Sequence, residues 1–242
     1  MAACRSLEFQ KALPAPRTLG TELRALQRTL GAAREWDVFV EETIAAVLAQ
    51  TCNRDALRPL IKAAQERRQR GHHDARAALH STDCTKLLTE LESLGLHHGG
   101  LANAKEESTG SIVGFAGEAL QHRHAKARKL GGKIRKIDQR ELHQLRIRLK
   151  KLRYTAELFH ALWRHRRTRE YLSSLAKLQR LLGKMHDATV AAGLIEKLVQ
   201  TGGAEIEHSG QLIRSWIAET VKHDRKRLLK RWRAFARIKP FW

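Results

Sequence analysis

The sequence has little cysteine and no long apolar run, and each shortage excludes a class of protein. Cys4, Cys52 and Cys84 are an odd number without CxxC spacing. This argues against a disulfide framework or a zinc site and fits a reducing cytosol. No apolar run approaches the roughly 20 residues of a membrane span, and the first residues do not resemble a signal peptide. We therefore expect a cytoplasmic protein without a membrane partner.

Proline and period-2 alternation are also scarce, which favours an all-α fold. There are four prolines in 242 residues, and no segment alternates convincingly as a strand does. Apolar residues recur instead at helical spacing, in segments near 18–30, 34–50, 55–80, 83–96, 111–130, 138–163, 168–182, 187–200 and 211–236. Gly31, Gly71 and Gly183 are expected to end or interrupt helices. A linker rich in Gly, Ser and charge follows His97 and extends to about Gly110.

Acidic residues are scarce in the second half of the chain. The whole sequence has 46 Lys and Arg against 25 Asp and Glu, a formal net charge of +21. Residues 1–100 hold 14 basic and 12 acidic side chains, whereas residues 101–242 hold 32 and 13. Such a field favours the capture of a multiply charged anion. Because 42% of the residues are hydrophobic, the chain is expected to have a packed core and not to be a disordered basic tail.

The segment from Glu141 to Phe159 combines an apolar face with a basic one. As a helix it places Leu142, Leu145, Leu149, Leu152, Ala156 and Phe159 on the core-facing side. Beside that face runs a row formed by His143, Arg146, Lys150 and Arg153, with Lys151 and Arg148 farther round the helix. Like charges one turn apart repel each other, so a polyanion across the row explains it best. A merely solvated basic face is the alternative, and it is what we expect for Arg148.

Two further helices carry rows of the same sign. One row consists of Arg123, Lys126 and Lys129, and the other of Lys222, Lys226, Lys230 and Arg233. For any single residue in these rows, a solvated face is an equally good interpretation. Three single-sign faces in one helical protein favour a binding surface. Asp138 precedes the helix that contains Glu141 to Phe159 and is expected to cap its N-terminus.

An internal repeat relates the two halves. Leu23-Arg-Ala-Leu-Gln-Arg-Thr-Leu-Gly31 aligns with Leu175-Ala-Lys-Leu-Gln-Arg-Leu-Leu-Gly183. Arg34-Glu35 then falls opposite His186-Asp187. The alignment predicts two pseudo-repeated antiparallel helical bundles within a single domain, residues 1–242, with half-repeats at 1–109 and 110–242.

These segments resemble the CHAD domain, the conserved histidine α-helical domain. Residues 143–159, HQLRIRLKKLRYTAELF, look like the family's central signature, and residues 178–194 and 23–39 look like its LG-x-x-polar-D segments. This resemblance implies a domain of two helical bundles, each with a His-x-x-Arg helix. Here only a remnant at residues 5–13 precedes the first repeat. The resemblance therefore implies a first bundle lacking its N-terminal helices, and it leaves open a dimer that covers an apolar patch.

The resemblance implies binding of inorganic polyphosphate and association with polyphosphate granules. The residue chemistry agrees, because closely spaced phosphates suit parallel rows of Lys and Arg. The expected site comprises His143, Arg146, Lys150, Lys151, Arg153, Arg123, Lys126, Lys129, Lys222, Lys226, Lys230 and Arg233. His143 either donates to phosphate when protonated or is a neutral histidine bonded to a neighbouring helix. No cofactor is expected.

Nucleic-acid binding is the first alternative. A chain of this charge binds DNA or RNA non-specifically through counterion release. However, no RNP-like, KH-like or zinc-finger pattern occurs, and aromatic residues are only 5%. Trp163, Trp216, Trp232 and Phe235 occupy apolar helical positions, where we expect core residues and not stacking platforms.

An enzyme, or an accessory module of a phosphate-metabolising enzyme, is the second alternative. Such an enzyme needs an acidic metal cluster or a phosphate loop, and no GxxxxGK[ST] occurs. Glu35, Asp37 and Asp187 are expected to cap helices or to pair with basic side chains. The histidines at 72–73, 97–98, 122 and 124 lack zinc-site spacing and are expected to be exposed. We therefore expect a non-enzymatic protein.

Overall fold

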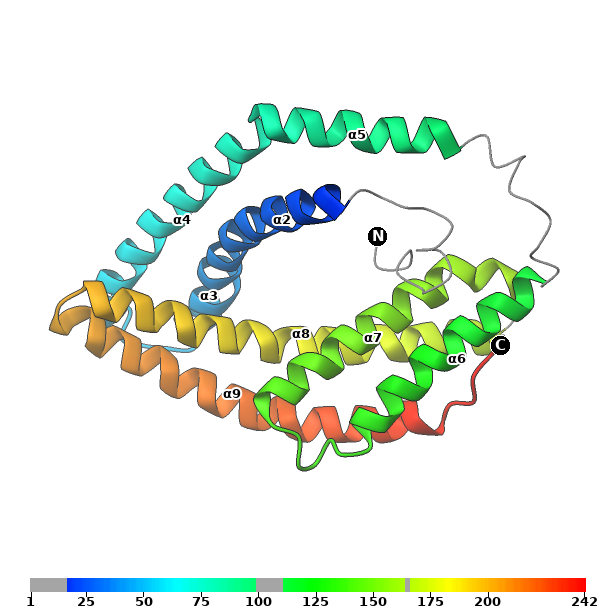
Figure 1. The fold of residues 1–242 in the computed structure, drawn as a ribbon. Helices are drawn as coiled ribbons and strands as arrows, with labels where there is room; N and C mark the ends of the chain where they lie inside the picture. Colours follow the sequence, from blue (N-terminus) through cyan, green and yellow to red (C-terminus); the bar gives the residue numbers. More distant parts are fainter. Residues whose placement is uncertain (1–16, 99–110, 164–165) are drawn as a thin grey trace. The chain divides into compact units, whose positions relative to one another are not determined.

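The computed structural model describes residues 17–98, 111–163 and 166–242 (Figure 1). Within these ranges every regular element is a helix and none is a strand, so the all-α prediction is confirmed. The remnant at residues 5–13 and most of the linker at 97–110 lie outside the described residues. None of the described helices is both long and apolar enough to cross a membrane.

The chain forms two compact units, each built from separate stretches of sequence. Unit 1 contains the described residues of 105–186 and 221–242, and unit 2 contains those of 14–104 and 187–220. The unit boundaries fall inside two long helices, α8 (Arg166–Thr201) and α9 (Ala204–Arg237). The compact units therefore differ from the two halves of the sequence, and the half-repeats at 1–109 and 110–242 stay a prediction.

Unit 1 is held together by one hydrophobic core. Its elements are α6 (Ile112–Gly131), α7 (Gln139–Phe159), η5 (His160–Leu162), the first part of α8 and the last part of α9. The apolar face predicted for α7 is confirmed for Leu142, Leu145, Leu149, Leu152 and Ala156, which are all buried in this core, whereas Phe159 is only half-buried. From α8 and α9 the core receives Tyr171, Leu175, Leu178, Leu182, Leu228, Trp232 and Phe235.

The hairpin formed by α6 and α7, with its turn, positions 13 of the 28 described Lys and Arg side chains of unit 1. The two helices lie side by side (Figure 1). The side chain of Ser111 caps α6, and Asp138 caps α7 as predicted, in a reciprocal capping box with Glu141. Arg225 of α9 donates to the carbonyl of Ile137 at 2.7 Å and so fixes the turn of the hairpin. The α7 helix therefore begins at a defined residue and in a defined direction.

Unit 2 contains the remaining helices. They are α2 (Arg17–Val38), a π-helical segment η2 (Phe39–Ile44), α3 (Ala45–Leu48), η3 (Asp55–Leu57), α4 (Arg58–Leu79), α5 (Thr82–His98), and parts of α8 and α9. Asp37 of α2 accepts hydrogen bonds from Arg68 and His72 of α4, each at 2.7 Å. Burial acts to raise the pKa of Asp37, but these two bonds and the charges of Arg68 and His72 lower it overall. Asp37 thus pairs with basic side chains, as expected from the sequence.

Three predicted helix breaks were wrong. α2 continues through Gly31, α4 through Gly71 and α8 through Gly183. The predicted helix at 18–30 therefore continues into the start of the one predicted at 34–50. The helices predicted at 168–182 and 187–200 are likewise one continuous helix. A glycine inside a helix costs only about 1 kcal/mol relative to alanine, and burial of neighbours such as Leu182 and Met185 offsets it. At Gly71 the glycine has a packing role, because a Cβ there would lie 3.3 Å from Cα of Ala33.

Candidate functional site

The net charge of the described chain belongs entirely to unit 1. Its described residues carry 28 Lys and Arg against 6 Asp and Glu, a net charge of +22. Those of unit 2 carry 14 against 16, a net charge of −2. The field that attracts an anion is therefore concentrated in the unit that contains α6, α7 and the end of α9.

The basic residues of α7 lie on two sides of its buried face. His143, Arg146, Lys150 and Arg153 follow one another at three- and four-residue steps on the side toward α8. Gln144, Arg148 and Lys151 follow on the side toward α6, where they line a groove. The core residues Leu145, Leu149 and Leu152 separate the two rows. The structure therefore divides the single basic site expected from the sequence into distinct surfaces.

A groove of about 760 Å³ runs between α6 and α7. It is lined by Ala119, His122, Arg123, Lys126, Lys129, Leu130, Lys133, Glu141, Gln144, Arg148 and Lys151. Four predicted site residues, Arg123, Lys126, Lys129 and Lys151, are thus brought together here. Lys133 was missed because it follows the end of the predicted helix, although it continues the same basic run in the sequence.

Arg148 is part of this groove, so the expectation that it is merely solvated was wrong. Its side chain is half-buried, and Nη1 donates to the carbonyl of Lys126 at 2.9 Å. Arg123 is also half-buried, and this desolvation lowers its pKa from the usual value. Glu141 is the one carboxylate among the lining residues, and it accepts a hydrogen bond from the backbone of Asp138 in the capping box. The groove is therefore cationic along its length.

The other side of α7 faces α8 and carries the row that resembles the family signature. The centres of the imidazole rings of His143 and His186 lie 4.9 Å apart. Burial lowers the pKa of His186, and the charges of Arg146 and His143 lower it further. Arg153 is already engaged, with Glu157 at 2.6 Å and with the side-chain oxygen of Gln179 at 3.1 Å. Of the described row, His143, Arg146 and Lys150 thus remain for an anion, and Lys150 also lies 5.6 Å from the ring centre of Tyr154.

The row on α9 forms a third surface. Lys222, Lys226, Lys230 and Arg233 are exposed, on the side of the helix opposite the buried Leu228, Trp232 and Phe235. None of the four lines the groove between α6 and α7. The structure therefore does not bring this predicted row into the concave site, and it contributes to the field as a solvent-facing helix surface.

Two histidines expected to be exposed are engaged in the structure. His124 is half-buried, and its Nδ1 lies 2.7 Å from the hydroxyl of Tyr171. Burial lowers the pKa of His124, and the nearby Arg128 lowers it further. His72 bonds to Asp37 in unit 2. Histidine contacts of this kind follow from helix packing, which spacing along the sequence does not reveal.

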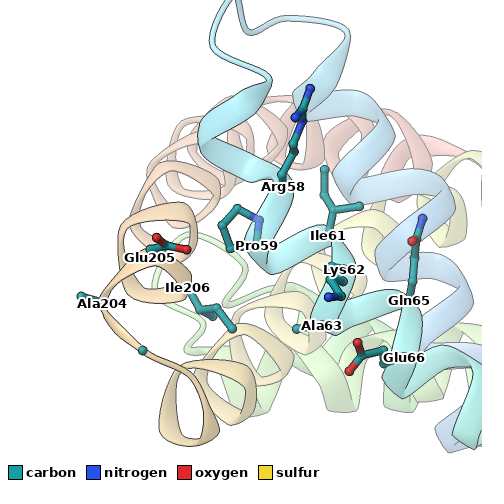
Figure 2. A pocket seen from close by; sticks show the side chains of 11 residues that line it. Arg58, Pro59, Ile61, Lys62, Ala63, Gln65, Glu66, Ala204, Glu205 and Ile206 are labelled. Atoms are coloured by element: carbon teal, nitrogen blue, oxygen red, sulfur yellow. The ribbon is translucent and has the colours of Figure 1, made fainter.

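A cavity in unit 2 has a different character. It has a volume of about 820 Å³ and lies in unit 2, lined by the first turns of α4 and α9 (Figure 2). Arg58 and Lys62 are accompanied by Glu66 and Glu205, and Pro59, Ile61 and Ile206 supply apolar surface. Because both signs of charge are present, this cavity does not suit a polyanion. Within the described ranges, no group of three or more His, Cys, Asp or Glu side chains is arranged to hold a metal ion.

The fold and the surface thus define an all-α protein with a strongly basic helical hairpin. Comparison with known proteins gives its family. The family profile of the CHAD domain matches residues 6–196. The crystal structure of the CHAD domain from the plant Ricinus communis is similar, with a TM-score of 0.78 and 30% sequence identity over 93% of this chain and 75% of that one. No curated protein matches the sequence. The chain belongs to the CHAD domain family.

Proposed function

We propose that this protein binds inorganic polyphosphate through the basic surfaces of unit 1, without catalysing a reaction on it. The observation that carries the proposal is the segregation of charge: a net +22 in the described part of unit 1 against −2 in that of unit 2. Membership of a family associated with polyphosphate binding supports the same ligand. A linear chain of phosphates offers the closely spaced negative charge that rows of Lys and Arg at helical pitch require.

The residues proposed to contact the ligand are those of the predicted rows. The row toward α8 supplies His143, Arg146 and Lys150, with Arg153 as a paired neighbour, and the groove supplies Arg123, Lys126, Lys129 and Lys151. The row of Lys222, Lys226, Lys230 and Arg233 acts at longer range through its charge. A protonated His143, at the head of the row toward α8, would donate to a phosphate oxygen.

Binding without catalysis is favoured by the state of the carboxylates near these rows. Glu141 takes part in the capping box, Glu157 pairs with Arg153, and Asp224 is buried beside Arg227 at 3.1 Å. A phosphoryl-transfer site needs carboxylates that can hold metal ions or activate a nucleophile. Association with polyphosphate granules is part of the proposal, because a protein that binds the polymer is retained where the polymer accumulates.

The test of the proposal is a titration of the whole chain with long-chain polyphosphate at near-physiological salt. The variant Arg146→Ala/Lys150→Ala removes two cations of the signature row and leaves the Arg153–Glu157 pair intact. A matched control, Arg24→Ala/Arg28→Ala, removes two exposed cations from unit 2. We expect the wild type to bind, the first variant to weaken binding and the control to have little effect. A wild-type chain that does not bind polyphosphate would overturn the proposal.

A further inference from the structure

The cations that line the groove between α6 and α7 have no ion-pair partner among the described residues. No carboxylate lies within ion-pair distance of Arg123, Lys126, Lys129, Lys133, Arg148 or Lys151 in the part of the chain that the structure describes. Glu141, the only acidic lining residue, is bonded to the backbone of Asp138. Six cations thus converge on one cavity where the fold supplies almost no compensating charge. Such an arrangement stabilises a bound anion and costs free energy without one.

Arg123 is evidence for an anion-binding groove beyond the surface charge alone. Its guanidinium is half-buried, and the described residues offer it no ion pair or hydrogen bond. An arginine does not escape the cost of burial by losing its proton, because it stays charged at any physiological pH. Arg148, across the groove, is instead held by the carbonyl of Lys126. One arginine is fixed by the fold, and the other has its donors available for a ligand.

The register of the hairpin sets the length of the site. The bond from Arg148 to Lys126 fixes α7 against α6 at the middle of the groove. Along α6, the cations from Arg123 to Lys129 cover about 9 Å of helix axis. This exceeds the size of a single phosphate and suits several phosphates in a row. The lining residues include no Trp, Tyr or Phe, and His122 is their one aromatic ring, so the groove offers a nucleic acid little surface on which successive bases would stack.

We infer that the groove between α6 and α7 is a binding site for a linear oligophosphate segment, separate from the signature row on the other side of α7. This inference rests on the proposed function and locates a site for it. Arg123 donates to phosphate oxygens from one wall, and Arg148 donates from the other wall through the nitrogens that the carbonyl of Lys126 does not occupy. Lys126, Lys129, Lys133 and Lys151 neutralise the phosphates between them.

The test compares two triple variants that lose the same charge from the same unit. The groove variant is Lys126→Ala/Lys129→Ala/Lys151→Ala, which breaks no described side-chain contact. The control is Lys226→Ala/Lys230→Ala/Arg233→Ala, on the exposed face of α9. Each is titrated with long-chain polyphosphate and with tripolyphosphate. We expect the groove variant to lose at least about tenfold more affinity than the control for both probes, since it loses direct charge-assisted bonds. Equal losses would overturn the groove site and leave polyphosphate binding itself standing.

A second readout on the wild type avoids any dependence on how well the variants fold. Acetylation of lysine side chains is measured by mass spectrometry with and without tripolyphosphate. The inference predicts protection of Lys126, Lys129 and Lys151 but not of Lys226 and Lys230. Protection of both sets to the same degree, or equal protection of the groove lysines by duplex DNA, would contradict a site specific for a phosphate chain. If the wild type bound neither probe, the proposed function would fall as well.

Discussion

At the scale of single residues, close packing decides which glycines are required. Gly131 ends α6 and is buried, and a Cβ added there would overlap the indole ring of Trp232. Gly183 lies inside α8, and nothing is found within 4 Å of the position where its Cβ would be. These two glycines of unit 1 therefore differ in their structural role. Gly131 leaves space for the ring of Trp232, whereas Gly183 only lowers the local stability of α8.

Gly131→Ala and Gly183→Ala should therefore change stability in opposite directions. We expect the first to lower the free energy of unfolding by about 1–3 kcal/mol or more, because Trp232 must move. The second should raise it by about 0.5–1 kcal/mol through helix propensity. Urea denaturation of both variants measures this, and a destabilised Gly183→Ala would show that α8 needs flexibility at this point.

His124 gives the core of unit 1 a pH dependence. Its folded-state pKa is lowered by burial and by Arg128, whereas in the unfolded chain it is about 6.5. The unfolded state therefore binds more protons as the pH falls from about 7, and the stability that the neutral His124 contributes is lost as the pH falls through its folded pKa. His124→Gln should show a shallower loss of unfolding free energy between pH 7 and pH 5 than the wild type does.

The control for this prediction is His122→Gln, on the same helix but exposed. It should retain the wild-type pH dependence, because it leaves His124 and its contact with Tyr171 in place. Asp37 and His186 also have lowered pKa values, so some acid sensitivity remains in every variant. Identical slopes for the wild type and His124→Gln would show that His124 does not contribute.

At the scale of elements, α7 was the best predicted part of the chain. Its buried face and its cap at Asp138 follow from spacing and from local side-chain chemistry, both of which a sequence displays. The groove could not be predicted in the same way, because it depends on the register of α7 against α6. Arg148 was assigned to solvent for that reason: its partner, the carbonyl of Lys126, is 22 residues away. The continuity of α8 was not predicted, because Gly183 was expected to end a helix, whereas burial of the neighbouring side chains outweighs the low helix propensity of glycine.

The cap of α7 offers a test at this scale. Asp138→Ala removes the side chain that accepts from the backbone N–H of Glu141 at 2.7 Å. We expect a loss of about 1 kcal/mol in the free energy of unfolding, the usual cost of an N-cap. Arg140→Ala, an exposed neighbour, is the control and should change stability little. Chemical denaturation of the two variants side by side would contradict the importance of the cap if both behaved alike.

At the scale of the whole molecule, the two compact units have the same class of fold but very different net charges. Both compact units are helical, but the described residues of unit 1 hold all the excess positive charge. The sequence showed this asymmetry only as a difference between halves, because α8 and α9 each contribute to both units. Ordinary helix packing explains the core of unit 1, whereas the rows of Lys and Arg on its surface are not part of that core. The polyanionic ligand that we propose would account for them.

The most direct measurement is a competition between long-chain polyphosphate and duplex DNA for the whole chain at near-physiological salt. We expect polyphosphate to displace DNA with a preference of orders of magnitude, and we expect this preference to persist as salt is raised. Binding of DNA through the general field alone falls steeply with salt. If the two polyanions bind alike and both are lost equally as salt rises, the charge of unit 1 is generic and the assignment to polyphosphate is wrong.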